Sequence, residues 1–321
     1  MLPEVEAWLD RRTSRARDWD AGVLADNKQG QRVTVVLPAR NESATVGTIV
    51  SGIRTALCER VPLVDEIVVI DSRSSDDTAE VAARAGATVY HQDAIRPDLA
   101  PGEGKGEALW KSLFVATGDI LVFIDADLLS FTPDYVTGLL GPLLTDPQVV
   151  YAKACYDRPL NGAPGDTYDG GRVTELVARP LLNQYWPQLA GFVQPLAGEY
   201  AGRADVLRRL PFVSHYGVEL GLLIDLLETV GLDALAQVDL GVREHTHQTT
   251  PDLGVMAAQI QHTARNRLLR SGRLVETGGV TTTLVQYVRS DTANGAYVPC
   301  PRETAITERP PADSVAEPAL T

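Results

Sequence analysis

The chain has 321 residues, of which 44% are hydrophobic and 22% are charged, and its formal net charge is −13. This length and composition predict a globular protein with a large core, in one domain or two. A nucleic-acid-binding protein would present a basic face, so the excess of negative charge argues against that class.

The sequence contains no apolar stretch of membrane-spanning length, and residues 1–20 are rich in charges of both signs. A signal peptide would need an apolar run, which is missing there. The three cysteines, Cys58, Cys155 and Cys300, are far apart and lack the spacing of metal ligands. We therefore expect a cytoplasmic protein with reduced thiols and no membrane span.

The first thirty residues are expected to form a helical arm. Val5, Trp8 and Leu9 would lie on one side of a short amphipathic helix over residues 3–18. The arginines that follow are interpreted as a solvated helix face, with contact to a partner as the alternative.

Strands and helices alternate between residues 31 and 150. Strands are expected over residues 33–37, 66–70, 87–90 and 120–124, where apolar and β-branched residues cluster. Helices are expected over residues 44–57, over a segment that ends near residue 85, and over residues 107–116. This alternation is typical of an α/β fold with a doubly wound, mostly parallel sheet and helices on both faces.

The fourth of these strands ends in two aspartates. Residues 120–124 are an unbroken apolar run, typical of a strand buried on both faces, and Asp125-Ala126-Asp127 follows. Side chains alternate along an extended chain, so Asp125 and Asp127 should face one site at the C-terminal edge of the sheet. Two neighbouring carboxylates repel each other unless a positive group lies between them. The pattern indicates a divalent cation that also binds a phosphate-containing ligand, and an acidic loop is the alternative.

Polar residues also follow the first two strands. Glu42 comes after the first strand, and Asp71 and Ser72 come after the second. If the strands are parallel, these ends converge with the two aspartates on one crevice. Such a crevice suits a nucleotide, whereas helix capping and turn formation are the alternatives for each residue taken alone.

Lys105 lies in a glycine-rich segment, residues 102–106, just before a predicted helix. Glycine lets the backbone approach a ligand and a helix N-terminus attracts anions, so Lys105 is predicted to contact a phosphate. The spacing is not that of a P-loop, and no Gly-x-Gly-x-x-Gly motif follows the first strand, which argues against a dinucleotide oxidoreductase.

The second half of the chain carries further candidates. Gly170, Gly171, Arg172 and Thr174 open an apolar helix and form a cradle suited to a small anion. Glu219 begins another apolar helix, where a favourable interaction with the helix dipole is the alternative to a functional role.

Two histidines follow a predicted strand over residues 234–240. His245 and His247, beside Arg243, could both face one site and are candidate metal ligands. Residues 301–321 contain several prolines and few large apolar residues, and we predict a disordered tail there.

Several of these segments resemble a known family. Residues 33–127 resemble the nucleotide-sugar domain of GT-A-fold glycosyltransferases, many of which share the Asp-x-Asp motif. Four strings are similar to those of actinobacterial glucosyl-3-phosphoglycerate synthases: residues 38–42 (PARNE), 101–110 (PGEGKGEALW), 170–182 (GGRVTELVARPLL) and 216–219 (YGVE). The resemblance extends over residues 30–260, and the last two strings are more specific than the Asp-x-Asp motif.

The resemblance implies a glycosyltransferase that depends on Mg²⁺ or Mn²⁺ and acts as a homodimer. It would transfer glucose with retention from a nucleotide sugar, UDP-glucose first of all, to the 2-hydroxyl of 3-phosphoglycerate, giving glucosyl-3-phosphoglycerate. Residues 31–150 would be the nucleotide-sugar-binding domain and residues 151–300 the acceptor-binding part.

Carried over by position, the resemblance assigns roles to individual residues. The residues expected to act in catalysis or to line the sugar pocket are Glu219, Asp127 and Leu196. The expected donor-binding residues are Pro38, Ala39, Glu42, Ser72, Lys105 and Asp125. The expected acceptor-binding residues are Gly171, Arg172, Val173, Thr174, Tyr216, Arg243 and His247, although His247 stands where the family has an asparagine. The expected metal ligands are Asp127 and His245.

Four alternatives remain open at this stage. A mannosyl-3-phosphoglycerate synthase that uses GDP-mannose would share the architecture. A polyprenyl-phosphate glycosyltransferase would share the motifs of the first half but usually acts at a membrane. A sugar-phosphate nucleotidyltransferase would need a glycine-rich basic loop after the first strand, which residues 38–42 do not supply. A nucleotide-sugar binding module without activity would lack metal or acceptor groups, yet Asp127, His245 and Arg172 are present.

Overall fold

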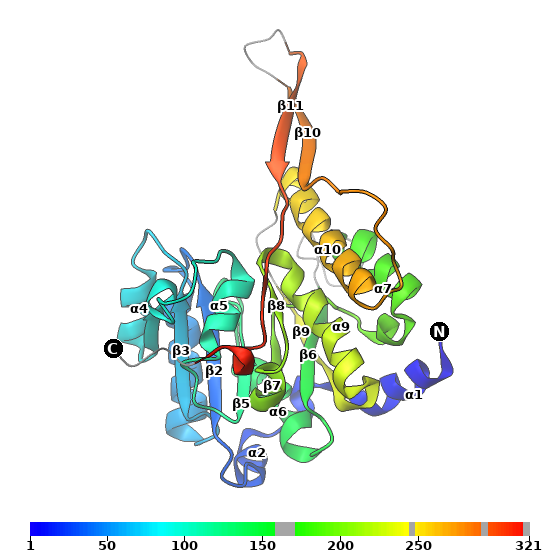
Figure 1. The fold of residues 1–321 in the computed structure, drawn as a ribbon. Coiled ribbons are helices and arrows are strands. Elements are labelled where there is room, and N and C mark those ends of the chain that lie inside the picture. The colour runs from blue at the N-terminus through cyan, green and yellow to red at the C-terminus, as the bar shows by residue number, and fades with distance from the viewer. Residues whose placement is uncertain (158–170, 244–247, 290–294, 317–321) are drawn as a thin grey trace.

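The computed structural model describes residues 1–157, 171–243, 248–289 and 295–316 (Figure 1). Its centre is an eight-stranded sheet in the order β1-β9-β6-β7-β5-β2-β3-β4. β7 runs antiparallel to both of its neighbours, and the other neighbouring strands are parallel. The predicted α/β fold with a doubly wound, mostly parallel sheet is therefore confirmed. The strands of this sheet are β1 (Thr13–Arg15), β2 (Val33–Ala39), β3 (Glu66–Asp71), β4 (Thr88–His91), β5 (Ile120–Phe123), β6 (Tyr151–Asp157), β7 (Tyr200–Arg203) and β9 (Leu235–Val242).

Helices cover both faces of the sheet because its central strands are apolar on both sides. In β2, Val33, Val35 and Leu37 face one buried cluster, and Val36 faces the other. The helices that contribute to the first cluster are α2 (Ala21–Asn27), α3 (Val46–Ile53), α4 (Thr78–Ala85) and α6 (Asp134–Thr145). Those that contribute to the second are α1 (Pro3–Arg12), α5 (Lys105–Ser112), α7 (Arg179–Tyr185), α8 (Ala204–Leu207), α9 (Val218–Val230) and α10 (Thr250–Arg270). None of the described helices is both long and apolar enough to cross a membrane.

The helix of the N-terminal arm is shorter than predicted. α1 ends at Arg12, and Thr13–Arg15 forms β1, which pairs in parallel with β9. Trp8 of α1 is fully buried and its indole nitrogen donates to the carbonyl of Leu235. Pairing with a strand more than 200 residues away thus overrides the local helical pattern. The same sheet also unites the two predicted parts, since β6 and β9 lie beyond residue 150.

The prediction of a disordered tail is wrong for residues 301–316, and residues 317–321 lie outside the described residues. β11 (Tyr297–Glu303) pairs with β10 (Thr283–Arg289) in a hairpin that projects from the body (Figure 1). β12 (Glu308–Arg309) then pairs with β8 (Phe212–Val213), and Ala312 is buried. Specific polar contacts hold this proline-rich segment in place, so its lack of large apolar residues does not make it disordered.

Candidate active site

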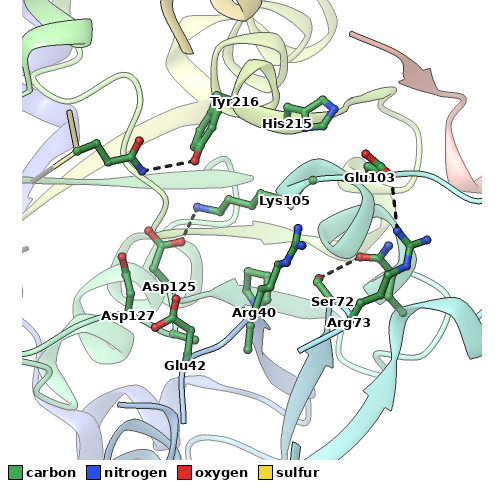
Figure 2. Close-up of a pocket in the computed structure, with 16 residues that line it drawn as sticks. Arg40, Glu42, Ser72, Arg73, Glu103, Lys105, Asp125, Asp127, His215 and Tyr216 are labelled. Atoms are coloured by element: carbon green, nitrogen blue, oxygen red, sulfur yellow. Dashed lines mark hydrogen bonds and ion pairs between the residues drawn. The ribbon is translucent and has the colours of Figure 1, made fainter. Parts of the chain in front are cut away.

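A cavity of 520 Å³ opens at the C-terminal ends of β2, β3 and β5, where parallel-sheet proteins bind ligands (Figure 2). The segment before α5 and the turn before α9 form its opposite wall. The cavity brings together the six predicted donor-binding residues, Asp127 and Tyr216. The lining residues are Pro38, Ala39, Arg40, Glu42, Ser72, Arg73, Gln92, Glu103, Gly104, Lys105, Asp125, Ala126, Asp127, His215, Tyr216 and Gln248.

Asp125 and Asp127 face one site, as the strand alternation predicts. One terminal nitrogen of Arg243 lies 3.1 Å from Asp125 Oδ2 and 3.2 Å from Asp127 Oδ1. The side chain of Asp127 is 52% exposed and that of Asp125 only 18%, so Asp127 is the more open to a ligand. Burial and the neighbouring Asp125 carboxylate raise the pKa of Asp127. A cation bound there would relieve this repulsion.

Lys105 connects the end of β5 to the first turn of α9. Its ammonium lies 2.5 Å from Asp125 Oδ1 and 3.1 Å from Glu219 Oε1. Burial alone would lower the pKa of Lys105, but the two carboxylates raise it above its usual value, so the side chain stays charged. A Cβ atom at position 198 would lie 2.3 Å from Asp125 Oδ2 and 2.4 Å from Lys105 Nζ, so this close approach requires Gly198.

Arg243 lies beneath the aspartates and is only 5% exposed. Its other terminal nitrogen donates to the hydroxyl of Tyr156 at 2.7 Å and lies 2.9 Å from Glu199 Oε1. Glu199 is fully buried, and that burial raises the pKa of its carboxyl despite the nearby guanidinium. Arg243 therefore contacts three carboxylates with its single positive charge. Its predicted contact with an acceptor stays a prediction.

The other side of the cavity carries the predicted nucleotide contacts. Pro38 and Ala39 are the last residues of β2, and the hydroxyl of Ser72, just after β3, donates to Gln92 Oε1 at 3.0 Å. Burial, followed by the charges of Asp127 and Asp125, raises the pKa of Glu42 to about 7. Leu196 is half-buried against the core and does not line the cavity.

Arg172 reaches the cavity through Gln248. Its guanidinium donates to the Gln248 carbonyl at 3.1 Å and to Thr250 Oγ1 at 3.4 Å. Gln248 Nε2 lies 3.5 Å from the hydroxyl of Tyr216, a contact drawn in Figure 2. Gln248 and Tyr216 line one end of the cavity, and Arg172 contacts Gln248 from outside the lining.

The other predicted acceptor-binding residues beside Arg172 lie in the turn that precedes α7. Gly171 has φ +81°, and Val173 and Thr174 are 8% and 3% exposed, so their side chains face the interior. His245 and His247 lie outside the described residues. Within the described ranges, no three carboxylate, imidazole or thiol groups form a metal cluster by themselves.

Comparison with known proteins places this geometry in a family. A model of glycosyl transferase family 2 matches residues 34–191. A glucosyl-3-phosphoglycerate synthase of Mycolicibacterium paratuberculosis is 42% identical, over 97% of this chain and 92% of its own. The chain belongs to the glucosyl-3-phosphoglycerate synthase family. It is therefore a glycosyltransferase.

Two solved structures of related enzymes have the same fold. Mannosyl-3-phosphoglycerate synthase from Rubrobacter xylanophilus matches with a TM-score of 0.89 and 39% identity, over 97% of this chain and 100% of its own. Glucosyl-3-phosphoglycerate synthase from Mycobacterium tuberculosis, in complex with Mn²⁺, UDP and phosphoglyceric acid, matches with a TM-score of 0.81 and 40% identity. That match covers 94% of this chain and 98% of the mycobacterial one. The GT-A-type fold predicted from the resemblance is thereby confirmed.

Six residues with polar or charged side chains line the cavity but were not among the predicted site residues. They are Arg40, Arg73, Gln92, Glu103, His215 and Gln248. Arg40 and Glu103 lie inside strings that the resemblance singled out, so position alone could have found them. Gln92 begins a one-turn 3-10 helix and Gln248 lies in a loop. Their proximity depends on the order of the strands, and no local pattern marks them.

Backbone conformation also marks the site. Asn41, Arg73 and His215 have positive φ values of 60°, 61° and 56°, a region that residues other than glycine rarely adopt. Arg73 and His215 line the cavity and Asn41 lies between two lining residues. Strained backbone of this kind concentrates at functional sites, where the surrounding structure holds it.

Proposed function

We propose that this chain transfers glucose from UDP-glucose to the 2-hydroxyl of 3-phosphoglycerate, with retention of configuration, and so forms glucosyl-3-phosphoglycerate. The observation that carries this proposal is the cavity in which Asp125, Asp127 and Lys105 meet beside the Arg172–Gln248–Tyr216 group. The relative from M. tuberculosis, solved with UDP-glucose and phosphoglyceric acid, supports the choice of substrates.

The donor would lie along the C-terminal edge of the sheet. Pro38, Ala39, Glu42 and Ser72 lie together there and would hold the uridine, with carboxylate and hydroxyl groups available to the ribose and the base. Asp125 would contact the nucleotide, and Lys105 would give up part of its ion pairing to meet the diphosphate.

The cavity suits a divalent cation. Three carboxylates, those of Glu42, Asp125 and Asp127, come from two strand ends, and burial together with the charges of Asp127 and Asp125 raises the pKa of Glu42. Asp127, with His245, would hold Mg²⁺ or Mn²⁺, the ions bound by the mycobacterial relative. When bound, the cation supplies positive charge that stabilises the departing diphosphate.

The acceptor would bind at the end of the cavity bordered by Tyr216 and Gln248. Arg172 is the half-buried cation at that end, and Gly171, Val173 and Thr174 share its turn, so this segment would hold the phosphate or carboxylate. Arg243 and His247 would complete the acceptor contacts. Leu196, on the loop that backs Lys105, would border the sugar.

Retention can be explained without a covalent enzyme intermediate. The acceptor 2-hydroxyl oxygen would bond to the anomeric carbon on the face from which the diphosphate departs, and its proton would pass to the departing phosphate oxygen. Glu219, held by Lys105 and 5% exposed, would position sugar hydroxyls rather than attack the anomeric carbon.

Glu219→Gln tests this role. The amide keeps the shape and can still accept hydrogen bonds, so we expect a reduced but measurable kcat, lower by about 10- to 100-fold. Steady-state kinetics would measure it, with Glu175→Gln, on an exposed surface pair, as the matched control. Loss of all turnover together with a glycosylated Glu219 in mass spectra of the wild type would contradict the proposal.

One observation favours a second donor. The mannosyl-3-phosphoglycerate synthase of R. xylanophilus has a higher TM-score than the glucosyl enzyme, 0.89 against 0.81. The alternative is therefore transfer of mannose from GDP-mannose to the same acceptor.

Release of nucleoside diphosphate by the purified protein decides between the donors. We would compare UDP-glucose, GDP-glucose and GDP-mannose with Mg²⁺, each with and without 3-phosphoglycerate. We expect the fastest release with UDP-glucose, and only when the acceptor is present. Equal release with and without 3-phosphoglycerate, or no release with any donor, would contradict the assignment of the Arg172 segment.

We also propose a cytoplasmic homodimer. The resemblance to the family implies the dimer, and the free thiols of Cys58, Cys155 and Cys300 support a reducing compartment.

A further inference from the structure

The loop over residues 194–198 contacts the donor side of the site. Its Gly198 lies so close to the ion pair of Lys105 and Asp125 that a Cβ atom there would collide with both side chains. Figure 2 draws this ion pair at the cavity. Leu196, the residue expected to border the sugar, lies two positions earlier in the same loop. The backbone of the loop therefore helps to define where Lys105 and the sugar can lie.

The other end of the same loop meets the acceptor side. A Cβ atom at position 171 would lie 3.7 Å from Gln194 Oε1, so the loop is adjacent to the segment that is expected to hold the acceptor. The loop thus runs from the acceptor segment to the donor-binding lysine. A misplacement of about 1 Å between reacting groups can reduce a rate by about 100-fold. Side chains that hold this loop in place can therefore affect the reaction without touching a substrate.

Two polar side chains from neighbouring strands hold the loop. Gln237 of β9 accepts a hydrogen bond from the amide of Val193 at 3.0 Å and donates to the carbonyl of Gly191 at 3.1 Å. Lys153 of β6 donates from its ammonium to the carbonyl of Ala197 at 2.8 Å. Among the described residues, no other group donates to that carbonyl. Gln237 therefore fixes the start of the loop, and Lys153 fixes its end beside the ion pair.

A lysine is an unfavourable residue for this contact. The Lys153 side chain is fully buried, and its ammonium has the Tyr151 hydroxyl at 3.5 Å and the ring centroid of Tyr200 at 5.2 Å, with no described carboxylate as an ion-pair partner. Burying a charge without such a partner destabilises the folded state, and an apolar side chain of similar length would avoid that cost. Departures of this kind from the rules of stable packing are expected at functional sites.

The charge of Lys153 also interacts with the site. Three carboxylates that are mostly buried lie near its ammonium, those of Asp125, Glu199 and Glu219. Burial lowers the pKa of Lys153, the three carboxylates act in the opposite direction, and the charge of Lys105 adds to the lowering. Lys153 thus adds positive charge behind a site where negative charge develops on the departing diphosphate, which favours the transition state.

We propose that Lys153 is a positioning residue for the transfer reaction. Its ammonium holds the Ala197 carbonyl, and through Gly198 this contact sets where Lys105 lies relative to the sugar and the acceptor. Lys153 does not line the cavity, so it acts through the loop rather than on a substrate. This inference rests on the proposed function. A wild type without acceptor-dependent release of nucleoside diphosphate would refute that function, whereas an active wild type with an unchanged kcat in the variants would refute this inference alone.

Lys153→Met tests the role because it removes both the hydrogen-bond donor and the charge but keeps an unbranched side chain. With UDP-glucose, 3-phosphoglycerate and Mg²⁺, we expect kcat to fall by about 10- to 100-fold. The dissociation constants of Mg²⁺-UDP and of 3-phosphoglycerate, measured by calorimetry, should change by less than about threefold, since misalignment lowers kcat without removing binding contacts. The number of UDP sites per chain corrects kcat for unfolded protein. A corrected kcat within about threefold of the wild type would overturn the inference.

Lys111→Met is the matched control. Lys111 of α5 is 3% exposed, and its ammonium also donates to backbone carbonyls, those of Ile95 and Arg96, none of which belongs to a residue that lines the cavity. We expect this variant to lose stability in urea unfolding but to keep the kcat of the wild type. A loss of kcat equal to that of Lys153→Met would mean that the effect is a general consequence of removing a buried lysine.

Lys153→Gln keeps the test decisive if Lys153→Met does not fold. The amide can still donate toward Ala197 but has no charge and a shorter side chain, so we expect a kcat between those of the wild type and Lys153→Met. The same two dissociation constants should again stay close to those of the wild type. A Lys153→Gln variant with the kcat of the wild type would overturn the inference.

Discussion

Lys153, in β6, is a lysine buried without a carboxylate partner among the described residues. Its side chain is 0% exposed, and the ammonium donates to the carbonyl of Ala197 at 2.8 Å and lies 5.2 Å from the ring centroid of Tyr200. Ala197 belongs to the loop that brings Gly198 against Lys105 and Asp125. Burial lowers the pKa of Lys153 to about 8. The charge thus holds an active-site loop at a cost in stability.

That cost makes the stability of the protein depend on pH. Between pH 8 and the usual lysine pKa of 10.5, Lys153 binds a proton in the unfolded chain but not in the folded one, so stability rises with pH. We expect the free energy of unfolding of the wild type, relative to Lys153→Met, to rise by about 3 kcal/mol from neutral pH to pH 10.5. Urea unfolding at a series of pH values would measure this. Parallel curves for the two proteins would show that Lys153 is not the titrating group.

At the scale of elements, the C-terminal segment braces the helix that carries Lys105. Arg309 forms two hydrogen bonds to Glu107 of α5, at 2.6 and 2.8 Å, and the indole of Trp110 donates to the carbonyl of Pro310. A Cβ atom at position 106 would lie 1.9 Å from the carbonyl oxygen of Val213, so α5 also packs closely on β8. β12 pairs with β8, so the C-terminal segment also contacts the strand against which α5 packs. The segment thereby fixes the start of α5 relative to the turn that bears Tyr216.

Arg309→Ala should destabilise the protein strongly. Glu107 is 3% exposed, so removing its partner leaves a buried carboxylate unpaired, at a cost of about 3 kcal/mol. Arg209→Ala breaks an exposed pair with Asp205 and should cost less than about 0.5 kcal/mol. Urea unfolding would compare the two. We expect Glu107→Gln to recover part of the loss in the Arg309→Ala background, and no recovery would mean that the buried charge is not the cause.

At the scale of the whole molecule, an acidic protein has to bind two anionic substrates. The cavity itself contains four carboxylates, those of Glu42, Glu103, Asp125 and Asp127, and the cations Arg40, Arg73 and Lys105. Lys105 is already paired with Asp125 and Glu219. The diphosphate of a nucleotide therefore depends on a divalent cation for much of its charge compensation.

We expect UDP to stabilise the protein only together with Mg²⁺ or Mn²⁺. Ligand at 100 times its dissociation constant stabilises the folded state by about 2.7 kcal/mol, so thermal unfolding should shift clearly upward. UDP with EDTA should give little shift, and Asp127→Asn should remove most of the shift seen with Mg²⁺. An equal shift with UDP alone would mean that Lys105 and the arginines suffice.

Much of the cavity could be predicted from the sequence because residues adjacent in the chain determine where many of its side chains lie. An apolar strand followed by Asp-x-Asp requires both carboxylates on one side, and parallel strands require their ends to meet at one edge. Lys105 lies at a helix start after glycines, which a local pattern also marks. The proline-rich C-terminal segment was misjudged because its anchors are single polar contacts to α5 and β8 rather than an apolar stripe.

The amino-acid sequence was enough to predict the α/β class, the edge of the sheet that carries the site, and most of its donor side, since these follow from periodicity and from residues adjacent in the chain. Three features depend on long-range contacts: Arg243 lies beneath the aspartates, Lys105 joins Asp125 to Glu219, and Lys153 is buried behind them. These contacts join residues between 20 and 118 positions apart. Their formation depends on strand order and on the burial of charge, which no local pattern contains.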